Sequence, residues 1–146
     1  MEAAAMIDLR WAAGFFDGEG SVRIGKATNQ NLGALDVAIS QVDRDLLVPF
    51  AERWGGRIRA VSGLRPGQRP ASVWVVYANA ALAFLTDIEP YVMSERNRQR
   101  IALAREFQEG AVKSSSLADD EYRNWRFGCY LRMKTLNRRG TNRSQP

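Results

Sequence analysis

Four short strand-like segments most constrain the fold, and polar and apolar residues alternate in the first two of them. They are Ser21–Ile24, Leu35–Ser40, Arg57–Val61 and Val73–Tyr77. Alternation over four to eight residues is typical of a strand with one buried face. Turn-forming residues separate the first two segments, at Ala27–Leu32, and the last two, at Gly63–Pro70. The sequence therefore predicts two antiparallel hairpins.

Helical patterns alternate with these hairpins. The predicted helices span Asp8–Phe16, Asp43–Trp54, Ala80–Asp87, Ser94–Gln108 and Asp119–Leu136. Asp8, Asp43 and Asn79 are predicted N-caps. The apolar face of the second helix comprises Leu46, Leu47, Phe50 and Trp54, with a kink expected at Pro49 and an end at Gly55-Gly56. Asp17–Gly20 is expected to end the first helix.

The order of elements predicts an α+β fold. The hairpins would form one antiparallel four-stranded sheet with helices on one face. The opposite face would carry Ser21, Arg23, Asp36, Ala38, Ser40, Arg57, Arg59, Ser72 and Trp74. We expect a single domain over residues 1–146, with a core at about 8–110 and a C-terminal helix at about 119–136. A linker at Ser114–Ser116 and a frayed basic tail at 137–146 complete this prediction.

Missing residue types exclude several chemistries. The chain has no histidine and one cysteine, Cys129. No Ser-His-Asp or Cys-His nucleophile system can be built, and a His-ligated or Cys-rich metal site is excluded. Catalysis would have to use carboxylates, Lys or Arg, hydroxyls, amides and an oxygen-loving cation such as Mg²⁺. Cys129 is expected to be a small buried apolar residue.

The charge is positive and clustered. The formal net charge is +5, and 18 of the 21 basic residues are Arg. No acidic residue occurs from Arg53 to Thr86. Clustered Arg favours a polyanionic partner, because its guanidinium contacts phosphate or guanine through two hydrogen bonds. The alternative interpretation is a solvated basic face without a partner.

No segment resembles a membrane span or a secretory signal. No apolar run approaches about 18 residues, and Met1–Arg10 lacks a basic leading region. We therefore expect a soluble intracellular protein, in the cytoplasm or nucleoid, or in an organelle if the gene is organellar.

The segment Ala12–Ser21, with sequence AAGFFDGEGS, resembles the signature of the LAGLIDADG homing endonucleases. The predicted αββαββα order also resembles that family. Three further segments agree with it: Ile39-Ser40-Gln41, Trp54-Gly55-Gly56 and Glu89-Pro90-Tyr91. The resemblance covers most of Leu9–Gln108. Because the motif occurs once, the chain resembles the single-motif branch, whose members act as homodimers.

Helix geometry supports a dimer. Two acids separated by one residue, such as Asp17 and Glu19, do not face each other on a helix and cannot act as one acid–base pair. Two copies of Leu9–Phe16 packed along a two-fold axis would bring both Glu19 side chains together, because Gly14 and Gly18 permit close approach. The predicted dimer interface comprises Trp11, Ala13, Gly14 and Asp17.

The resemblance also assigns a catalytic site. Glu19 matches the metal-binding acid, with Gly18 beside it, and Asp17 matches a more structural acid. Gln41 matches a polar residue that helps to position water. The basic residue expected after Pro90 falls on Glu95, so Arg96 or Arg98 would substitute, and Arg96 is the candidate. The alternatives are that Asp17 and Glu19 are only helix-end polar residues and that Gln41 is an ordinary strand-end amide.

The resemblance implies a site-specific double-strand DNA endonuclease that hydrolyses phosphodiesters at a long, pseudo-palindromic site. Such enzymes are encoded in introns, inteins or free-standing genes. Mg²⁺ would be the cofactor, with Mn²⁺ or Ca²⁺ as alternative occupants, and neither a small-molecule cofactor nor a membrane is expected. The predicted DNA-binding residues are Ser21, Arg23, Lys26, Ser40, Arg57, Arg59, Arg65, Arg69, Ser72 and Trp74.

Two alternatives to this function stay open. One is a nucleic-acid-binding protein of the same fold without cleavage activity, either an RNA maturase or a DNA-binding regulator. The other is a generic basic RNA-binding module without a symmetric dimer.

Overall fold

A computed structural model describes residues 6–26, 33–61, 65–111 and 119–138. Along the chain, the elements are α1 (Leu9–Glu19), β1 (Gly20–Ile24), β2 (Leu35–Gln41), η1 (Arg44–Leu46), α2 (Val48–Trp54), β3 (Arg57–Ala60), β4 (Ser72–Tyr77), α3 (Ala78–Ile88), η2 (Glu89–Tyr91), α4 (Glu95–Glu109) and α5 (Asp120–Leu136). The predicted turn at Ala27–Leu32, the linker Ser114–Ser116, residues 62–64 of the second hairpin region and the tail from 139 lie outside the described residues.

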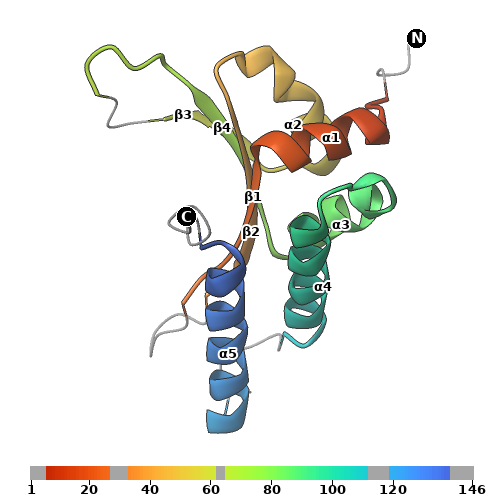
Figure 1. The fold of residues 1–146 in the computed structure, drawn as a ribbon, viewed down its shortest axis with the longest axis vertical. Helices are drawn as coiled ribbons and strands as arrows, with labels where there is room; N and C mark the ends of the chain where they lie inside the picture. Colours follow the sequence, from red (N-terminus) through yellow and green to blue (C-terminus); the bar gives the residue numbers. More distant parts are fainter. Residues whose placement is uncertain (1–5, 27–32, 62–64, 112–118, 139–146) are drawn as a thin grey trace, which may run out of the picture.

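The strands form one antiparallel sheet in the order β1-β2-β4-β3. Figure 1 shows α1, α3 and α4 on the same side of this sheet. The α+β prediction with a four-stranded sheet and helices on one face is confirmed. No helix in the described ranges has the length and apolar character needed to cross a membrane.

Register determines which face of the sheet is buried. Val22 pairs with Val37, which pairs with Val76, and Trp74 pairs with both Ile39 and Ile58. All these side chains share one face, because successive residues of a strand point to opposite sides. All are buried except Ile58, which is partly buried and packs against the core.

Aromatic rings fill the space between this face and the helices. Trp74 and Phe84 are both fully buried, and their ring centroids lie 5.1 Å apart at an interplanar angle of 76°. Phe50 from α2 also packs here, with its ring centroid 5.3 Å from that of Trp74. The Trp74 indole Nε1 donates to the carbonyl of Gly55 at 2.7 Å, so the buried ring leaves no polar atom unpaired.

The structure corrects the prediction for β4. Trp74 was expected on the face opposite the helices, but it is fully buried beneath them. Ser72 shares its side of the strand, because it pairs with Gln41 and Ala60 two positions from Trp74. The opposite positions of β4 are Val73 and Val75. Alternation could not assign the faces, because this central strand is apolar on both sides.

Three helix boundaries also differ from the prediction. α1 continues past Phe16 to Glu19. The segment after Asp43 is not one kinked helix but a short 3₁₀ turn followed by α2, because Pro49 lies in the first turn of α2, where its missing N–H costs no bond. Leu46 consequently lies in the 3₁₀ turn, 37% exposed, rather than on an apolar helix face. Asn79 is not an N-cap, since α3 begins at Ala78 and the Asn79 Oδ1 atom instead accepts from Gln108.

The helix α5 packs against α4 and β1. Its inner side contributes Cys129 and Met133 to the core, each 1% exposed, which confirms the expectation for Cys129. Asn137 follows as the C-cap and donates to the Val22 carbonyl at 2.7 Å. The predicted frayed tail therefore does not begin at Asn137, because this residue is hydrogen-bonded to the sheet.

The buried position of Trp74 predicts a large cost for Trp74→Phe. The substitution removes the donor to Gly55 and leaves a void, which should lower the free energy of unfolding by about 2–4 kcal/mol. Tyr77→Phe at the exposed end of the same strand should change it by less than about 0.5 kcal/mol. Guanidinium unfolding at one protein concentration measures both variants, and equal stabilities would contradict this account of the core.

Candidate nucleic-acid interface and acidic site

Glu19 lies at a tight corner between a helix and a strand. It is the last residue of α1, and β1 begins at the next residue. The Gly20 N–H donates to the Phe16 carbonyl. A Cβ atom at position 20 would overlap the fully buried Phe16 ring, so only glycine fits there. The corner presents the exposed Glu19 side chain at a fixed place.

The surroundings of Glu19 suit a hard divalent cation. The last turn of α1 contains no basic residue, and the carbonyl oxygens at a helix C-terminus carry partial negative charge. Carboxylate and carbonyl oxygens are the ligands that Mg²⁺ and Ca²⁺ prefer. Glu19 and the Gly18 carbonyl fit this donor set. No group of three or more acidic, His or Cys side chains lies together within the described ranges.

The Asp17 carboxylate accepts hydrogen bonds from its own chain. Its Oδ2 atom accepts from the backbone N–H groups of Met93 at 2.8 Å and Ser94 at 3.4 Å. Its Oδ1 atom accepts from the Asn97 Nδ2 amide at 2.8 Å. Ser94 is the N-cap of α4, so Asp17 places a negative charge at the positive end of that helix. The Asp17 carboxylate thus joins α1 to α4 within one chain, which fits the more structural role expected for it. Its place in the dimer interface stays a prediction.

The outer face of α1 is open. Trp11 is 40% exposed, and among the described residues nothing beyond the adjacent residues and the backbone of α1 lies within 4 Å of a Cβ atom built on Gly14 or Gly18. Ala13, by contrast, is fully buried in the core of its own chain, so it is not an interface residue. The open strip therefore runs through Trp11, Gly14 and Gly18.

The other predicted catalytic residues lie at the end of β2 and in the first turn of α4. The Gln41 Oε1 atom accepts from the Val42 N–H at 2.8 Å, which fixes its carboxamide at the strand end. Arg98 pairs with Glu95 at 3.3 Å, whereas Arg96 is exposed in the first turn of α4. Of the two basic candidates, Arg98 is thus paired with Glu95, the acid at the position where the resemblance places a basic residue.

The sheet face opposite the helices, here called the open face, is polar and basic. It carries Ser21, Arg23, Asp36, Ala38, Ser40, Arg57, Arg59, Val73 and Val75. A hollow of about 350 Å³ on this face is lined by side chains from all four strands. Asp36 is the one acidic residue in the four strands. Lys26, Arg65 and Arg69 are exposed in the segments beyond the strands.

Asp36 orients Arg23. The Arg23 Nε atom donates to Asp36 Oδ1 at 3.1 Å, and the Arg23 side chain is 62% exposed while that of Asp36 is 12% exposed. Burial raises the pKa of the Asp36 carboxyl above its ordinary value, and the Arg23 charge and hydrogen bond partly offset that rise. Since the pair uses only Nε, the remaining guanidinium N–H groups keep their capacity to bind a phosphate or a base edge.

Sequence reasoning missed a polar group behind the acidic corner. Asn97, Arg100 and Asn137 link α4 and the end of α5 to α1 and β1. Arg100 was not among the predicted site residues, and Asn137 was expected in the frayed tail. A single sequence gives no sign that these residues meet, because Arg100–Asn137, Asn97–Asp17 and Asn137–Val22 are 37, 80 and 115 positions apart.

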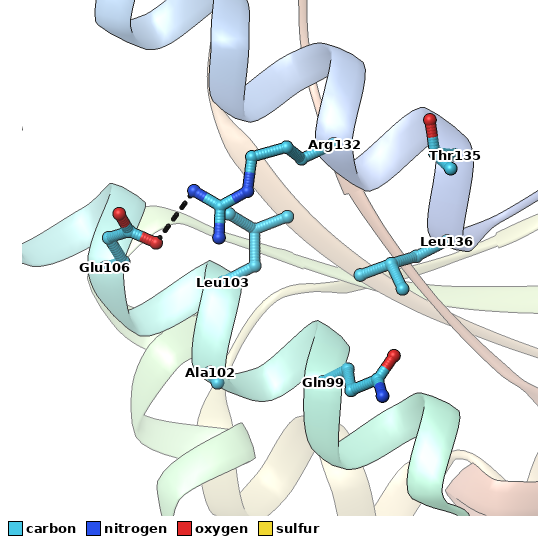
Figure 2. Close-up of a pocket in the computed structure, with 7 residues that line it drawn as sticks. All are labelled: Gln99, Ala102, Leu103, Glu106, Arg132, Thr135 and Leu136. Carbon is cyan, nitrogen blue, oxygen red and sulfur yellow. Dashed lines mark hydrogen bonds and ion pairs between the residues drawn. The ribbon is translucent and has the colours of Figure 1, made fainter.

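A separate groove of about 480 Å³ lies between α4 and α5 (Figure 2). Leu103 and Leu136 contribute its apolar side, and Arg132 pairs with Glu106 across it at 3.0 Å. None of the predicted site residues lines it.

Solved structures share this architecture. The homing endonuclease I-CvuI, in complex with its target, aligns with a TM-score of 0.68 and 16% identity over 88% of this chain and 80% of that chain. The archaeal intron-encoded homing endonuclease I-Vdi141I, complexed with DNA, gives 0.67 and 22% over 90% and 85%. The LAGLIDADG meganuclease I-AabMI, bound to uncleaved DNA, gives 0.67 and 23% over 90% and 45%.

This chain has the LAGLIDADG homing endonuclease fold. The fold predicted from the motif at Ala12–Ser21 is therefore confirmed. In sequence, an intron-encoded DNA endonuclease of Dictyostelium discoideum, ai2b, is 23% identical over 115 residues, which are 79% of this chain and 44% of that protein. The chain thus spans less than half the length of that relative. No family model matches the chain.

The Arg23–Asp36 pair predicts a pH-dependent stability. Since folding raises the pKa of Asp36, this group contributes most stability below its unfolded pKa and loses that contribution as pH rises through its folded pKa. Arg23→Ala should raise the pKa further, so the free energy of unfolding should fall more steeply as the pH rises above about 4 than it does in the parent chain.

The double variant Arg23→Ala with Asp36→Asn should lack this additional fall, and Arg57→Ala on the same face should resemble the parent. Denaturant unfolding at several pH values measures these differences. A steeper fall that persists in the double variant would assign it to groups other than Asp36.

Proposed function

We propose that this chain forms a homodimeric, divalent-metal-dependent endonuclease that cuts double-stranded DNA at a specific long site. The observation that carries this proposal is the exposed Glu19 carboxylate at the end of α1, in a fold whose solved examples are DNA-bound homing endonucleases. The basic open face supports DNA as the substrate, because Arg side chains bind phosphates and base edges.

A dimer is proposed because one chain offers too few metal ligands. We propose Glu19 and the Gly18 carbonyl as the oxygen donors from a single chain, whereas Mg²⁺ is six-coordinate and completes its shell with phosphates and waters. The strip of Trp11, Gly14 and Gly18 supplies a helix face on which a second copy could pack closely. Packing there would bring two Glu19 carboxylates to the same stretch of DNA backbone.

A bound divalent cation supplies two effects, activation of water and neutralisation of charge on the phosphodiester oxygens. Glu19 and the Gly18 carbonyl would hold that cation. Gln41, fixed by its bond from Val42, would use its amide group to orient the attacking water. Arg96, exposed in the first turn of α4, would place a positive charge beside the cleaved phosphate.

The open face would lie in the major groove. Ser21, Ser40, Arg23, Arg57 and Arg59 alternate with the buried apolar residues, so their side chains project toward a duplex. Lys26, Arg65 and Arg69 would contact phosphates beyond the strands. Phosphate contacts supply affinity, and base-edge contacts supply specificity.

A second candidate function is nucleic-acid binding without cleavage. Glu95 favours it, because an acid stands where the family resemblance places a basic residue, and it pairs with Arg98. An RNA maturase or a DNA-binding regulator would use the same basic face. The exposed Glu19 favours cleavage, since an acid at that corner is not needed to hold the fold. A generic RNA-binding module would not explain the open strip on α1.

Glu19→Gln is expected to abolish cleavage while leaving DNA affinity within about twofold. The substitution keeps the size of the side chain but removes the anionic metal ligand, so the cleavage rate should fall by at least about 10³-fold. Glu109→Gln, an exposed acid at the end of α4, is the control and should cut at the parent rate.

Plasmid libraries carrying random inserts, incubated with Mg²⁺ and then with EDTA, measure cleavage. DNA affinity is measured with Ca²⁺. Binding without any cutting by the parent chain would support the second candidate function. A joint loss of binding and cutting in Glu19→Gln would instead indicate a folding role for this residue.

Gly14→Leu is expected to prevent dimerisation. A Cβ atom at position 14 meets nothing within 4 Å beyond its own helix backbone in the part of the chain that the structure describes, and leucine is a better helix former by about 0.8 kcal/mol, so the monomer should still fold. Gly128→Leu on α5 is the matched control, because it is also helical with open space around its Cβ. Sedimentation should show a monomer only for Gly14→Leu. A dimer in both variants would show that α1 is not the interface.

A further inference from the structure

A continuous chain of side-chain hydrogen bonds lies behind the acidic corner. The Asn97 Nδ2 amide donates to Asp17 at 2.8 Å, and the Asn97 Oδ1 atom accepts from Arg100 Nη1 at 2.7 Å. Arg100 Nε donates to Asn137 Oδ1 at 2.7 Å. Asn137 Nδ2 then donates to the Val22 carbonyl at 2.7 Å. Asn97, Arg100 and Asn137, here called the bracket, thus connect Asp17 to Val22.

The two ends of the bracket flank Glu19. Asp17 lies two residues before it in α1, and Val22 lies three residues after it in β1. The bracket therefore holds the helix on one side of the corner and the strand on the other.

The bond to Val22 falls on an exposed strand edge. β1 is the first strand of the sheet, so only one of its edges is paired, with β2. Gly25 N–H donates to the Ala34 carbonyl at 2.8 Å, and in an antiparallel pair the residues that exchange hydrogen bonds alternate. By this alternation, the Val22 carbonyl points away from β2. Asn137 supplies the partner that this edge otherwise lacks.

The hydrogen bonds of the bracket restrict the conformations of its three side chains. Asn97 is 3% exposed, and its amide donates to Asp17 while its carbonyl accepts from Arg100. Arg100 also donates from Nη2 to the Leu136 carbonyl at 3.0 Å, so it holds the end of α5. A partly buried network in which each side chain makes at least two hydrogen bonds favours one arrangement, because an unpaired buried group would cost its desolvation.

We propose that Asn97, Arg100 and Asn137 are positioning residues that fix the backbone of the corner and thereby the Glu19 carboxylate. This role rests on the proposed function, in which Glu19 binds a divalent cation. Metal ligands must be held within about 0.5 Å of the productive geometry by the groups behind them. The bracket provides that support from α4 and α5, which lie outside the motif.

Asn137→Ala tests the proposal. It removes the contacts to both Val22 and Arg100, and Asn137 is only partly buried, so the chain should fold. Gln108→Ala is the matched control: it breaks a 2.9 Å side-chain bond to Asn79 from the other end of α4. Arg100→Lys is a second variant, which keeps the positive charge but not the planar group that binds both asparagines.

Two measurements are made on the full chain with a random-sequence duplex. Amide hydrogen exchange is measured at residues 18–21. Mn²⁺ binding is measured by electron paramagnetic resonance, and only the part of the binding that is lost in Glu19→Gln is counted. We expect faster exchange at the corner and about tenfold weaker Mn²⁺ binding in Asn137→Ala and Arg100→Lys, with neither change in Gln108→Ala.

Unchanged corner exchange in folded Asn137→Ala and Arg100→Lys would overturn the proposal. Faster exchange with unchanged Mn²⁺ affinity would also overturn it, because the bracket would then be structural only. If the parent chain shows no Mn²⁺ binding that depends on Glu19, the proposed metal-dependent function fails and the role toward the metal fails with it. Hydrogen exchange would still decide separately whether the bracket holds the corner.

Discussion

The structure depends on a sheet that keeps one face apolar. Val22, Val37, Val76 and Trp74 lie side by side across three strands, and helices cover them because exposing such a face to water is unfavourable. The covering helices leave the opposite face unoccupied. The positions that alternate with the core residues therefore carry Arg23, Arg57 and Arg59 to the surface, so one packing constraint produces both the core and the basic face.

Helix geometry gives the two nearby acids, Asp17 and Glu19, different environments. Successive residues of a helix are about 100° apart, so Asp17 and Glu19 point to different sides of α1. Asp17 turns inward and accepts three hydrogen bonds from the start of α4. Glu19 turns outward at the corner with β1. One acid thus stabilises the position from which the other can act.

The open face also contains Asp36, an acid whose burial is unfavourable when it is ionised. Its partner, Arg23, is itself a candidate DNA contact. Asp36 is largely buried, and its ionised form is tolerated through Arg23. Removing Arg23 would therefore disturb both stability and binding, whereas removing Arg57 would test binding more directly. Any mutational map of this face has to separate these two effects.

The sequence by itself determined the order of elements, the two hairpins, the motif and the placement of Arg23, Arg57 and Arg59, because alternation and helical spacing are local properties of the chain. It did not determine which face of β4 is buried, since valines occupy both sides around Trp74. Only the tertiary structure decided that Trp74 fills the core, that Asp17 binds α4, and that Asn97, Arg100 and Asn137 meet behind Glu19. These contacts join residues distant in sequence, and their partners are fixed by how the helices pack on the sheet.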